Sequence, residues 1–137
     1  MVDFLSWHNS EVRCVTPPDP HGGQVRVILS AGAVLRASEG ATFKAGLPGF
    51  IKPLELVFEQ ARLTGPIDDC VGGMAQGELR LTSMRAHPVK QIPLPWQCAE
   101  TLTLSLQFRN GSLLLIEAAS AHCTPSDEST FIESYAC

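Results

Sequence analysis

The chain has 137 residues, 45% of them hydrophobic and 18% charged, and a net charge of −4. This length fits one domain, and the composition is too apolar and too weakly charged for a disordered chain, so we predict a single globular domain over residues 1–137. No apolar run approaches the roughly 20 residues of a membrane-spanning helix. The ten Lys and Arg residues are scattered, so neither a membrane nor a nucleic acid is an expected partner.

The cysteines and the first residues together suggest a cytoplasmic protein. Five cysteines, widely spaced and odd in number, are unlike a disulfide framework. The segment from Met1 to Trp7 has neither the basic start nor the apolar stretch of a signal peptide. We therefore expect reduced cysteines and a cytoplasmic location.

Three short strands are expected in the first third of the chain. The first lies around Glu11–Thr16 and is followed by a loop rich in Pro and Gly. The β-branched residues of Gln24–Ser30 predict the second strand, and Ala33–Ser38 is expected to pair with it as a hairpin across a turn at Ala31-Gly32. Residues 39–52 are expected to form a long loop held down by four apolar side chains, those of Phe43, Leu47, Phe50 and Ile51.

Residues 53–64 fit two different elements. A helix would begin at Pro53, place apolar residues on one face and end at the Gly-Pro pair that follows the segment. A strand is supported by the alternation of Leu54, Leu56 and Phe58 with other residues. Because the neighbouring segments all have the character of strands, we prefer the strand and keep the helix as the alternative.

The next segments are again short and extended. Residues 67–76 are polar and rich in glycine, which predicts a loop, and Gly77–Met84 is expected to be a strand. Residues 87–95 contain three prolines, so they can form an edge strand or a connector but not a central strand. A closing strand is expected at Thr130–Tyr135.

The clearest signal in the chain is a β-hairpin over Thr101–Ala119. Leucines alternate strictly with polar residues before Asn110-Gly111, and a second apolar run follows. A two-residue loop at Asn110-Gly111 would place Glu117 opposite Leu104, on the apolar face. A three-residue loop over 109–111 avoids this burial of a carboxylate, so we predict the three-residue loop.

This loop also decides which hairpin side chains face outward. With Gly111 in the left-handed conformation of a bulge, Leu106 lies opposite Leu114 on the inner face. Leu113 and Leu115 then fall on the outer face, which polar residues otherwise occupy. Exposed leucines on a sheet suggest a covered surface, so we predict a homodimer or protein-partner contact at these two residues. The alternative is that another segment of the same chain covers them.

About eight short strands at spacings near ten residues predict a mainly antiparallel β protein, either a β-sandwich or a flattened barrel. The chain contains no Cys-x-x-Cys, His-x-x-x-His or Gly-x-Ser-x-Gly motif, so no metal, cofactor or catalytic residue is assigned. If a small-molecule pocket is present, we expect it near Trp96, with Arg62 and His87 as polar partners.

Three classes of function follow, in order of preference. The first is a non-catalytic binding or protein-interaction module. The second is a barrel that binds a small apolar ligand in its interior. The third is a small enzyme with a carboxylate or a histidine in a cleft.

Overall fold

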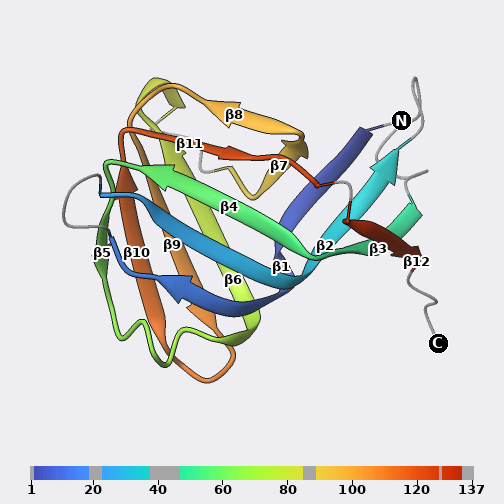
Figure 1. Cartoon of the computed structure of the whole chain (residues 1–137), viewed down its shortest axis with the longest axis horizontal. Helices are drawn as coiled ribbons and strands as arrows, with labels where there is room; N and C mark the ends of the chain where they lie inside the picture. Colours follow the sequence, from blue (N-terminus) through green and yellow to red (C-terminus); the bar gives the residue numbers. More distant parts are fainter. Residues whose placement is uncertain (1, 19–22, 38–46, 85–88, 127, 134–137) are drawn as a thin grey trace.

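The computed structural model describes residues 2–18, 23–37, 47–84, 89–126 and 128–133. Apart from one 3-10 turn at Thr82–Met84, the regular structure of these residues is antiparallel β (Figure 1). The strands are β1 (Val2–Thr16), β2 (Val25–Ala37), β3 (Leu47–Lys52), β4 (Leu54–Glu59), β5 (Arg62–Thr64), β6 (Gly72–Leu81), β7 (Gln91–Leu94), β8 (Trp96–Cys98), β9 (Leu102–Phe108), β10 (Leu113–Ala118), β11 (Ser120–Cys123) and β12 (Thr130–Glu133).

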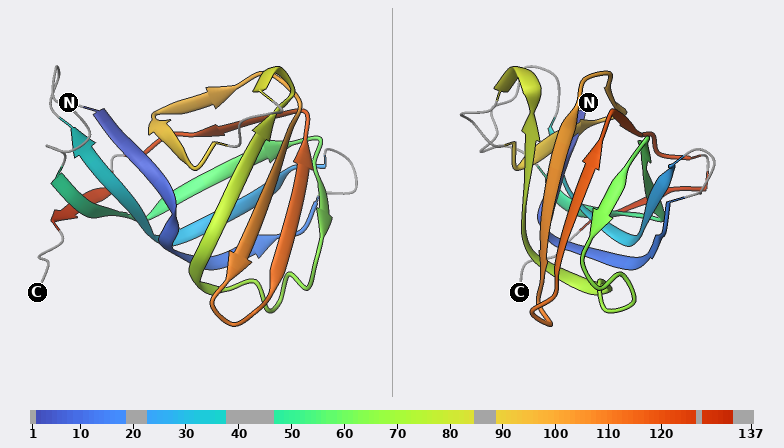
Figure 2. Two further views of the ribbon diagram at one scale, coloured as in Figure 1. Left: turned by 180° about the vertical axis from the view of Figure 1, so that it is seen from behind. Right: turned by 90° about the vertical axis from the view of Figure 1, so that its left-hand side faces the viewer.

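These strands form a flattened barrel with two layers (Figures 1 and 2). One layer has the order β5-β10-β9-β6, and the ladder continues through β1-β2-β4-β11-β8 in the other. β10 and β11 are two parts of one chain segment that bends at Ala119, and β4 and β5 are separated by Gln60 and Ala61 alone. Since β4 pairs with β11 and β5 pairs with β10, the two bent segments pass together from one layer to the other. The predicted fold class is confirmed.

The β9–β10 hairpin has the predicted three-residue loop. The Phe108 N–H donates to the Ser112 carbonyl at 2.9 Å, and Gly111 has a φ of 92°. Leu106 lies opposite Leu114, and Leu104 lies opposite Ile116, as expected from burial. The short-range pattern of the sequence was therefore sufficient to define the register of this hairpin.

Residues 53–64 form strands, and the alternative of a helix is wrong. Leu54, Leu56 and Phe58 are all buried, as their alternation predicts. The segment bends at Gln60, whose φ is 49°, and then continues as β5. The Ala119 N–H donates to the Glu59 carbonyl at 3.0 Å, so both bent segments turn at the same place. Pairing over the whole length of the segment explains why the strand is preferred here.

The hairpin expected within residues 24–38 is also wrong. β2 runs without interruption through Ala31-Gly32 and pairs with β1 on both sides of this point. A Cβ atom at Gly32 would lie 2.8 Å from Leu54 Cδ2 and 3.0 Å from Leu5 Cδ1. The glycine is therefore explained by close packing against these leucines, and no turn is needed to account for it.

Part of the loop expected over residues 39–52 is a strand. Its last six residues, Leu47–Lys52, form β3, which pairs with β2 and with the closing strand β12. Ile51 is buried as expected, whereas Phe43 and Tyr135 lie outside the described residues. β3, β12 and the adjoining ends of β1 and β2 extend beyond the barrel (Figure 1).

Two more predicted boundaries shift. β6 begins at Gly72, so half of the loop expected at 67–76 is strand. β7 lies within the proline-rich segment and pairs with β1, which agrees with the expected edge strand.

No helix in the described part of the chain is long and apolar enough to cross a membrane.

Buried side chains from both layers fill the interior of the barrel. Trp7, Phe58 and Phe108 are its largest fully buried residues. They belong to one contiguous cluster with leucines, valines and isoleucines from both layers. Burial of this apolar area is the main source of stability for a domain of this size.

Candidate functional site

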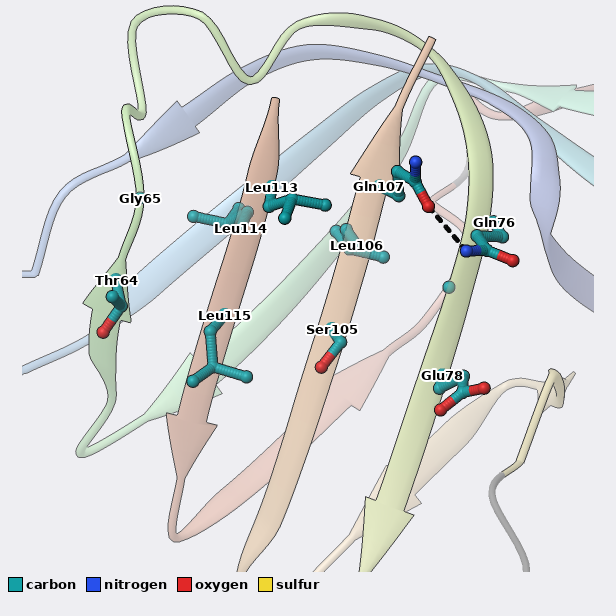
Figure 3. Close-up of a pocket in the computed structure, with 11 residues that line it drawn as sticks. Thr64, Gly65, Gln76, Glu78, Ser105, Leu106, Gln107, Leu113, Leu114 and Leu115 are labelled. Carbon is teal, nitrogen blue, oxygen red and sulfur yellow. Dashed lines mark hydrogen bonds between the residues drawn. The ribbon is translucent and has the colours of Figure 1, made fainter. Parts of the chain in front are cut away.

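The outer surface of the β5-β10-β9-β6 layer combines exposed leucines with polar side chains (Figure 3). The register places the outward side chains in rows that cross the strands. Leu113 stands in a row with Gln107 and Gln76, and Leu115 stands in the next row with Ser105 and Glu78. We call this surface the leucine face; its residues are Thr64, Gln76, Glu78, Ser105, Gln107, Leu113 and Leu115.

Leu113 is 62% exposed, and Leu115 is half-buried. No segment of the described chain therefore covers Leu113, contrary to the alternative that another strand or loop conceals both leucines. A hollow of about 450 Å³ lies beside the two side chains. The buried Leu106 and Leu114 and the backbone of Gly65 and Gly77 contribute to its floor.

Polar and charged groups surround the leucines on this face. The Gln76 side-chain amide donates to the Gln107 amide oxygen at 2.5 Å. In the row next to Leu115, Glu117 lies opposite Arg62 on one side and Thr103 on the other, and Thr103 lies opposite Arg80. The two leucines and the hollow beside them therefore form an apolar patch, and the row next to Leu115 carries both signs of charge.

The structure separates the residues that were predicted to form a ligand pocket. Trp96 lies on β8 and is buried against the core, whereas Arg62 lies on β5, where it is opposite Glu117 of β10. Trp96 borders a surface hollow with His122 and Gln97 on the opposite layer. Arg62 instead joins the margin of the leucine face. His87 lies outside the described residues.

A second hollow, of about 600 Å³, opens between β1, β6 and β7. Its lining includes Ser6, His8, Glu78 and Lys90, so it is more polar than the hollow beside the leucines. His8 Nδ1 lies 2.7 Å from the Ala75 carbonyl oxygen. Because Glu78 borders both hollows, the polar hollow adjoins the leucine face.

A third hollow lies on the other layer and contains groups that suit acid–base chemistry. Arg13, Glu55, His122 and Glu128 are among its lining residues. An ion pair at 3.5 Å joins Glu55 to Arg26, which places a cation beside this carboxylate. Across the described ranges, no three His, Cys, Asp or Glu side chains are grouped closely enough to hold a metal ion.

The cysteines of the described chain are free thiols, and three of them are buried. Burial raises the pKa of Cys123 to about 12, and the negative charge of Glu55 acts in the same direction. Burial also raises the pKa of Cys70, with a contribution from Asp69. A raised pKa disfavours the thiolate, so neither residue is a suitable nucleophile.

We expect the buried Cys123 thiol to make folding stability fall at alkaline pH. Its folded pKa is about 12 against an ordinary value of 9.0, so the unfolded chain loses this proton first. The contribution is complete below pH 9 and is lost as the pH rises from 9 toward 12. The loss of unfolding free energy is about 1.4 kcal/mol at pH 10. Urea unfolding of the wild type and of Cys123→Ala at pH 8 and pH 10 measures it. Equal losses in both proteins would contradict this assignment.

Sequence reasoning found the two leucines but missed their neighbours. Gln76 and Glu78 lie in a stretch where polar residues alternate with Gly77 and Leu79, which is the same period-two signal as in the hairpin. That signal predicts an outer polar face, but it does not say which strand lies beside β9. Comparison with known proteins gives no further guide, because no family model, curated protein or solved structure matches the chain.

Proposed function

We propose that this chain is a non-catalytic interaction module that binds a protein partner through the leucine face. The observation that carries the proposal is Leu113, which is 62% exposed beside an apolar hollow on an otherwise polar surface. Burying one leucine side chain completely contributes about 1.5–3 kcal/mol. Leu113 and the half-buried Leu115 therefore provide a considerable driving force for association.

The arrangement of this surface also supports the proposal. Such interfaces have an apolar centre, from which contact excludes water, and a polar margin that stays partly hydrated. On the leucine face the hollow beside Leu113 and Leu115 supplies the centre. The Gln76–Gln107 pair and the charged row through Glu117 supply the margin.

The charges of the margin favour a protein over a polyanion as the partner. Arg62 and Arg80 are interspersed with Glu78 and Glu117, and an ion pair of 3.5 Å joins Arg80 to Glu78. A nucleic-acid surface needs clustered cations without acidic neighbours. Mixed charge instead orients a partner whose own margin carries both signs.

The two other classes of function have less support. An apolar ligand inside the barrel would need the space that Trp7, Phe58 and Phe108 occupy. An enzyme would need a reactive group, and the buried Cys123 has a pKa raised by its surroundings. The hollow around Glu55 and His122 is the place where a catalytic alternative would be sought.

Substitution of the two leucines tests the proposal. We expect Leu113→Lys with Leu115→Lys to weaken partner binding by at least about 30-fold, because each loss removes more than about 1 kcal/mol of buried apolar contact. The matched control is Val71→Lys, which places the same charge at another exposed apolar residue. Proteins that bind to the wild type and to the control, but not to the double variant, are the candidate partners.

Binding of a purified candidate partner then tests whether the leucine face is the binding site. Hydrogen exchange of the reconstituted complex should show slower exchange over residues 102–118, and the measured dissociation constant should rise in the double variant alone. Thermal unfolding of all three proteins checks that the variants fold. Equal affinity of the double variant and the control, or protection confined to other strands, would exclude the leucine face as the binding site.

A further inference from the structure

The loop of the β9–β10 hairpin carries an asparagine followed by a glycine, and both residues are exposed. Apart from its chain neighbours, no atom of the described residues lies within 4 Å of the place where a Cβ of Gly111 would be. Asn9 and Asn110 are the two asparagines of the chain. Asn9 precedes Ser10, which is fully buried, whereas Asn110 precedes the exposed Gly111. The two asparagines therefore differ in the residue that follows them.

An Asn-Gly pair permits a reaction that needs no enzyme. The backbone nitrogen of the glycine loses its proton and attacks the side-chain carbonyl carbon of the asparagine. The new C–N bond closes a succinimide ring, and the bond to the side-chain nitrogen breaks, so that nitrogen leaves as ammonia. Water then opens the ring at either of its carbonyls and gives aspartate or isoaspartate. Glycine favours the attack because it has no Cβ atom to hinder the approach.

The fold holds both reacting groups of this pair in hydrogen bonds. The Asn110 Nδ2 donates to the Asp69 carbonyl at 2.7 Å, and the Asn110 Oδ1 accepts from the Ser112 N–H at 2.9 Å. The Gly111 N–H, whose nitrogen is the nucleophile, donates to the Phe108 carbonyl at 3.0 Å. These bonds must open before the nitrogen reaches the side-chain carbon. The reaction is therefore slower in the folded chain than in an unfolded one.

The bond from Asn110 also connects the hairpin loop to the turn at residues 66–70, between β5 and β6. Within this turn the Asp69 N–H donates to the Pro66 carbonyl at 2.9 Å, and the Cys70 N–H donates to the same carbonyl at 3.1 Å. The loop and the turn lie side by side at one end of the β5-β10-β9-β6 layer (Figure 1). The Asn110 amide thus links two segments that are distant in sequence.

We propose that Asn110 is a site of spontaneous deamidation, and that its conversion releases the hairpin loop from the 66–70 turn. A carboxylate accepts hydrogen bonds but donates none, so the Asp69 carbonyl loses its donor. The new carboxylate also faces this carbonyl oxygen across the former bond. Asp68 and Asp69 are exposed acidic residues of the same turn, so a further negative charge is repelled here.

The isoaspartate product has a second effect on the loop. Its main chain passes through the former side-chain carbonyl carbon, so the backbone of the loop gains one methylene group. The Phe108 N–H donates to the Ser112 carbonyl at 2.9 Å across a loop of three residues. Because hairpin geometry depends on loop length, the longer backbone no longer fits this closure. Both products therefore loosen the same end of the layer.

Asn9 provides a control within the same chain. Its Oδ1 accepts from the Arg109 Nη2 at 2.6 Å, so this side chain is also hydrogen-bonded. The next nitrogen, however, belongs to Ser10, whose buried hydroxyl donates one hydrogen bond and accepts another. Attack by this nitrogen would require the buried serine to move. We therefore expect Asn9 to stay unmodified while Asn110 is converted.

Incubation of the full, reduced chain at mildly alkaline pH tests the reaction, with a synthetic peptide of residues 106–114 as the unfolded reference. Digestion with pepsin in acid, where the ring closes slowly, is followed by chromatography and mass spectrometry. We expect Asn110 to be converted roughly 10- to 100-fold more slowly than in the peptide, because two or three hydrogen bonds must open at about fivefold each. Asn110 that is converted over 1,000-fold more slowly, or Asn9 that is converted equally fast, would overturn the proposal.

Hydrogen exchange of Asn110→Asp tests the release of the loop. The Asp69 and Cys70 amides should exchange at least about fivefold faster than in the wild type, which corresponds to the loss of one hydrogen bond. The Ser129 amide, which is hydrogen-bonded in the loop between β11 and β12, should be unchanged. The matched control is Gln97→Glu, the same change from amide to acid at an exposed residue of β8, and it should leave all three amides unchanged.

The naturally deamidated chain, separated by ion exchange, should show the same faster exchange as Asn110→Asp. Thermal unfolding checks that each protein is folded. Unchanged exchange of the 66–70 turn in the folded variant and in the deamidated chain would mean that the Asn110 amide does not hold the turn. Asn110 lies outside the leucine face, so these results do not depend on the partner of that surface.

Discussion

Replacing Gly77 by alanine is expected to lower the free energy of unfolding by about 1–3 kcal/mol, which is the usual cost of overfilling a packed core. A Cβ atom at this position would lie 2.6 Å from Trp7 Cβ, 2.8 Å from Trp7 Cγ and 2.9 Å from Leu106 Cδ2. Trp7 is fully buried and its indole N–H lies 3.4 Å from the Val89 carbonyl oxygen, so the ring has little room to move. Urea unfolding measures the loss.

The control for this prediction lies on the same strand. A Cβ atom at Gly73 would meet the Arg109 side chain at 3.2 Å. Arg109 is exposed and its side chain is flexible, so Gly73→Ala should change the free energy of unfolding by less than about 0.5 kcal/mol. Equal losses of stability in the two variants would mean that replacing any glycine of β6 has this effect. The contact with Trp7 would then not be the cause.

Replacing Ser10 by alanine is expected to cost about 1–3 kcal/mol, because it removes a buried hydroxyl that bridges an interruption in the β1–β2 ladder. The pairing passes from Ser6 opposite Ala33 directly to Glu11 opposite Ala31. Within the interruption, the Ser10 hydroxyl donates to the Ser6 carbonyl at 2.6 Å and accepts from the Ala33 N–H at 2.8 Å.

Two measurements separate this role from a general loss of stability. Hydrogen exchange at the Ala33 amide should become faster in Ser10→Ala under conditions where the rest of β2 stays protected. Ser30→Ala removes a hydroxyl that bonds to the Glu11 carboxylate at an exposed position of the same strand pair, and it should cost less than about 0.5 kcal/mol. Unchanged exchange at Ala33 would mean that the Ser10 hydroxyl is dispensable.

Both positions are buried within the sheet. Gly77 lies between Gln76 and Glu78, so its close contact with Trp7 sets how near β6 lies to the core beneath the leucine face. Ser10 and Ala33 lie at the interruption in the β1–β2 ladder. Folding defects at these sites are therefore expected to affect binding indirectly, so surface substitutions are the sharper tests of function.

The prediction of the candidate site was partial for a physical reason. The outward positions of Leu113 and Leu115 follow from the hairpin, whose partners are close in sequence. Their neighbours Gln76 and Thr64 come from distant strands, and no local pattern states which strand lies beside which. The same limit explains the predicted grouping of Arg62 with Trp96: Arg62 lies opposite Glu117 of β10, whereas Trp96 lies opposite Cys123 of β11.

β2 and β3 show the opposite case, in which local patterns point away from the structure. Ala31-Gly32 has the composition of a turn, yet β2 stays extended there because Leu5 and Leu54 pack against the glycine. Pro48 and Gly49 indicate a loop, yet Phe131 covers Gly49 and β12 completes the pairing of β3. In both places a contact from a distant strand outweighs the local preference.

By itself, the sequence determined the antiparallel β class and the register of the β9–β10 hairpin, and it favoured a strand over a helix for residues 53–64. Each of these depends on period-two burial and on turn residues that lie within a few positions of one another. Only the tertiary structure decided the closure of the barrel through the two bent segments, the continuity of β2 and the residues that lie beside Leu113 and Leu115. These depend on pairing between strands far apart in the chain, where the identity of the neighbour, and not the local sequence, sets which side chains are covered.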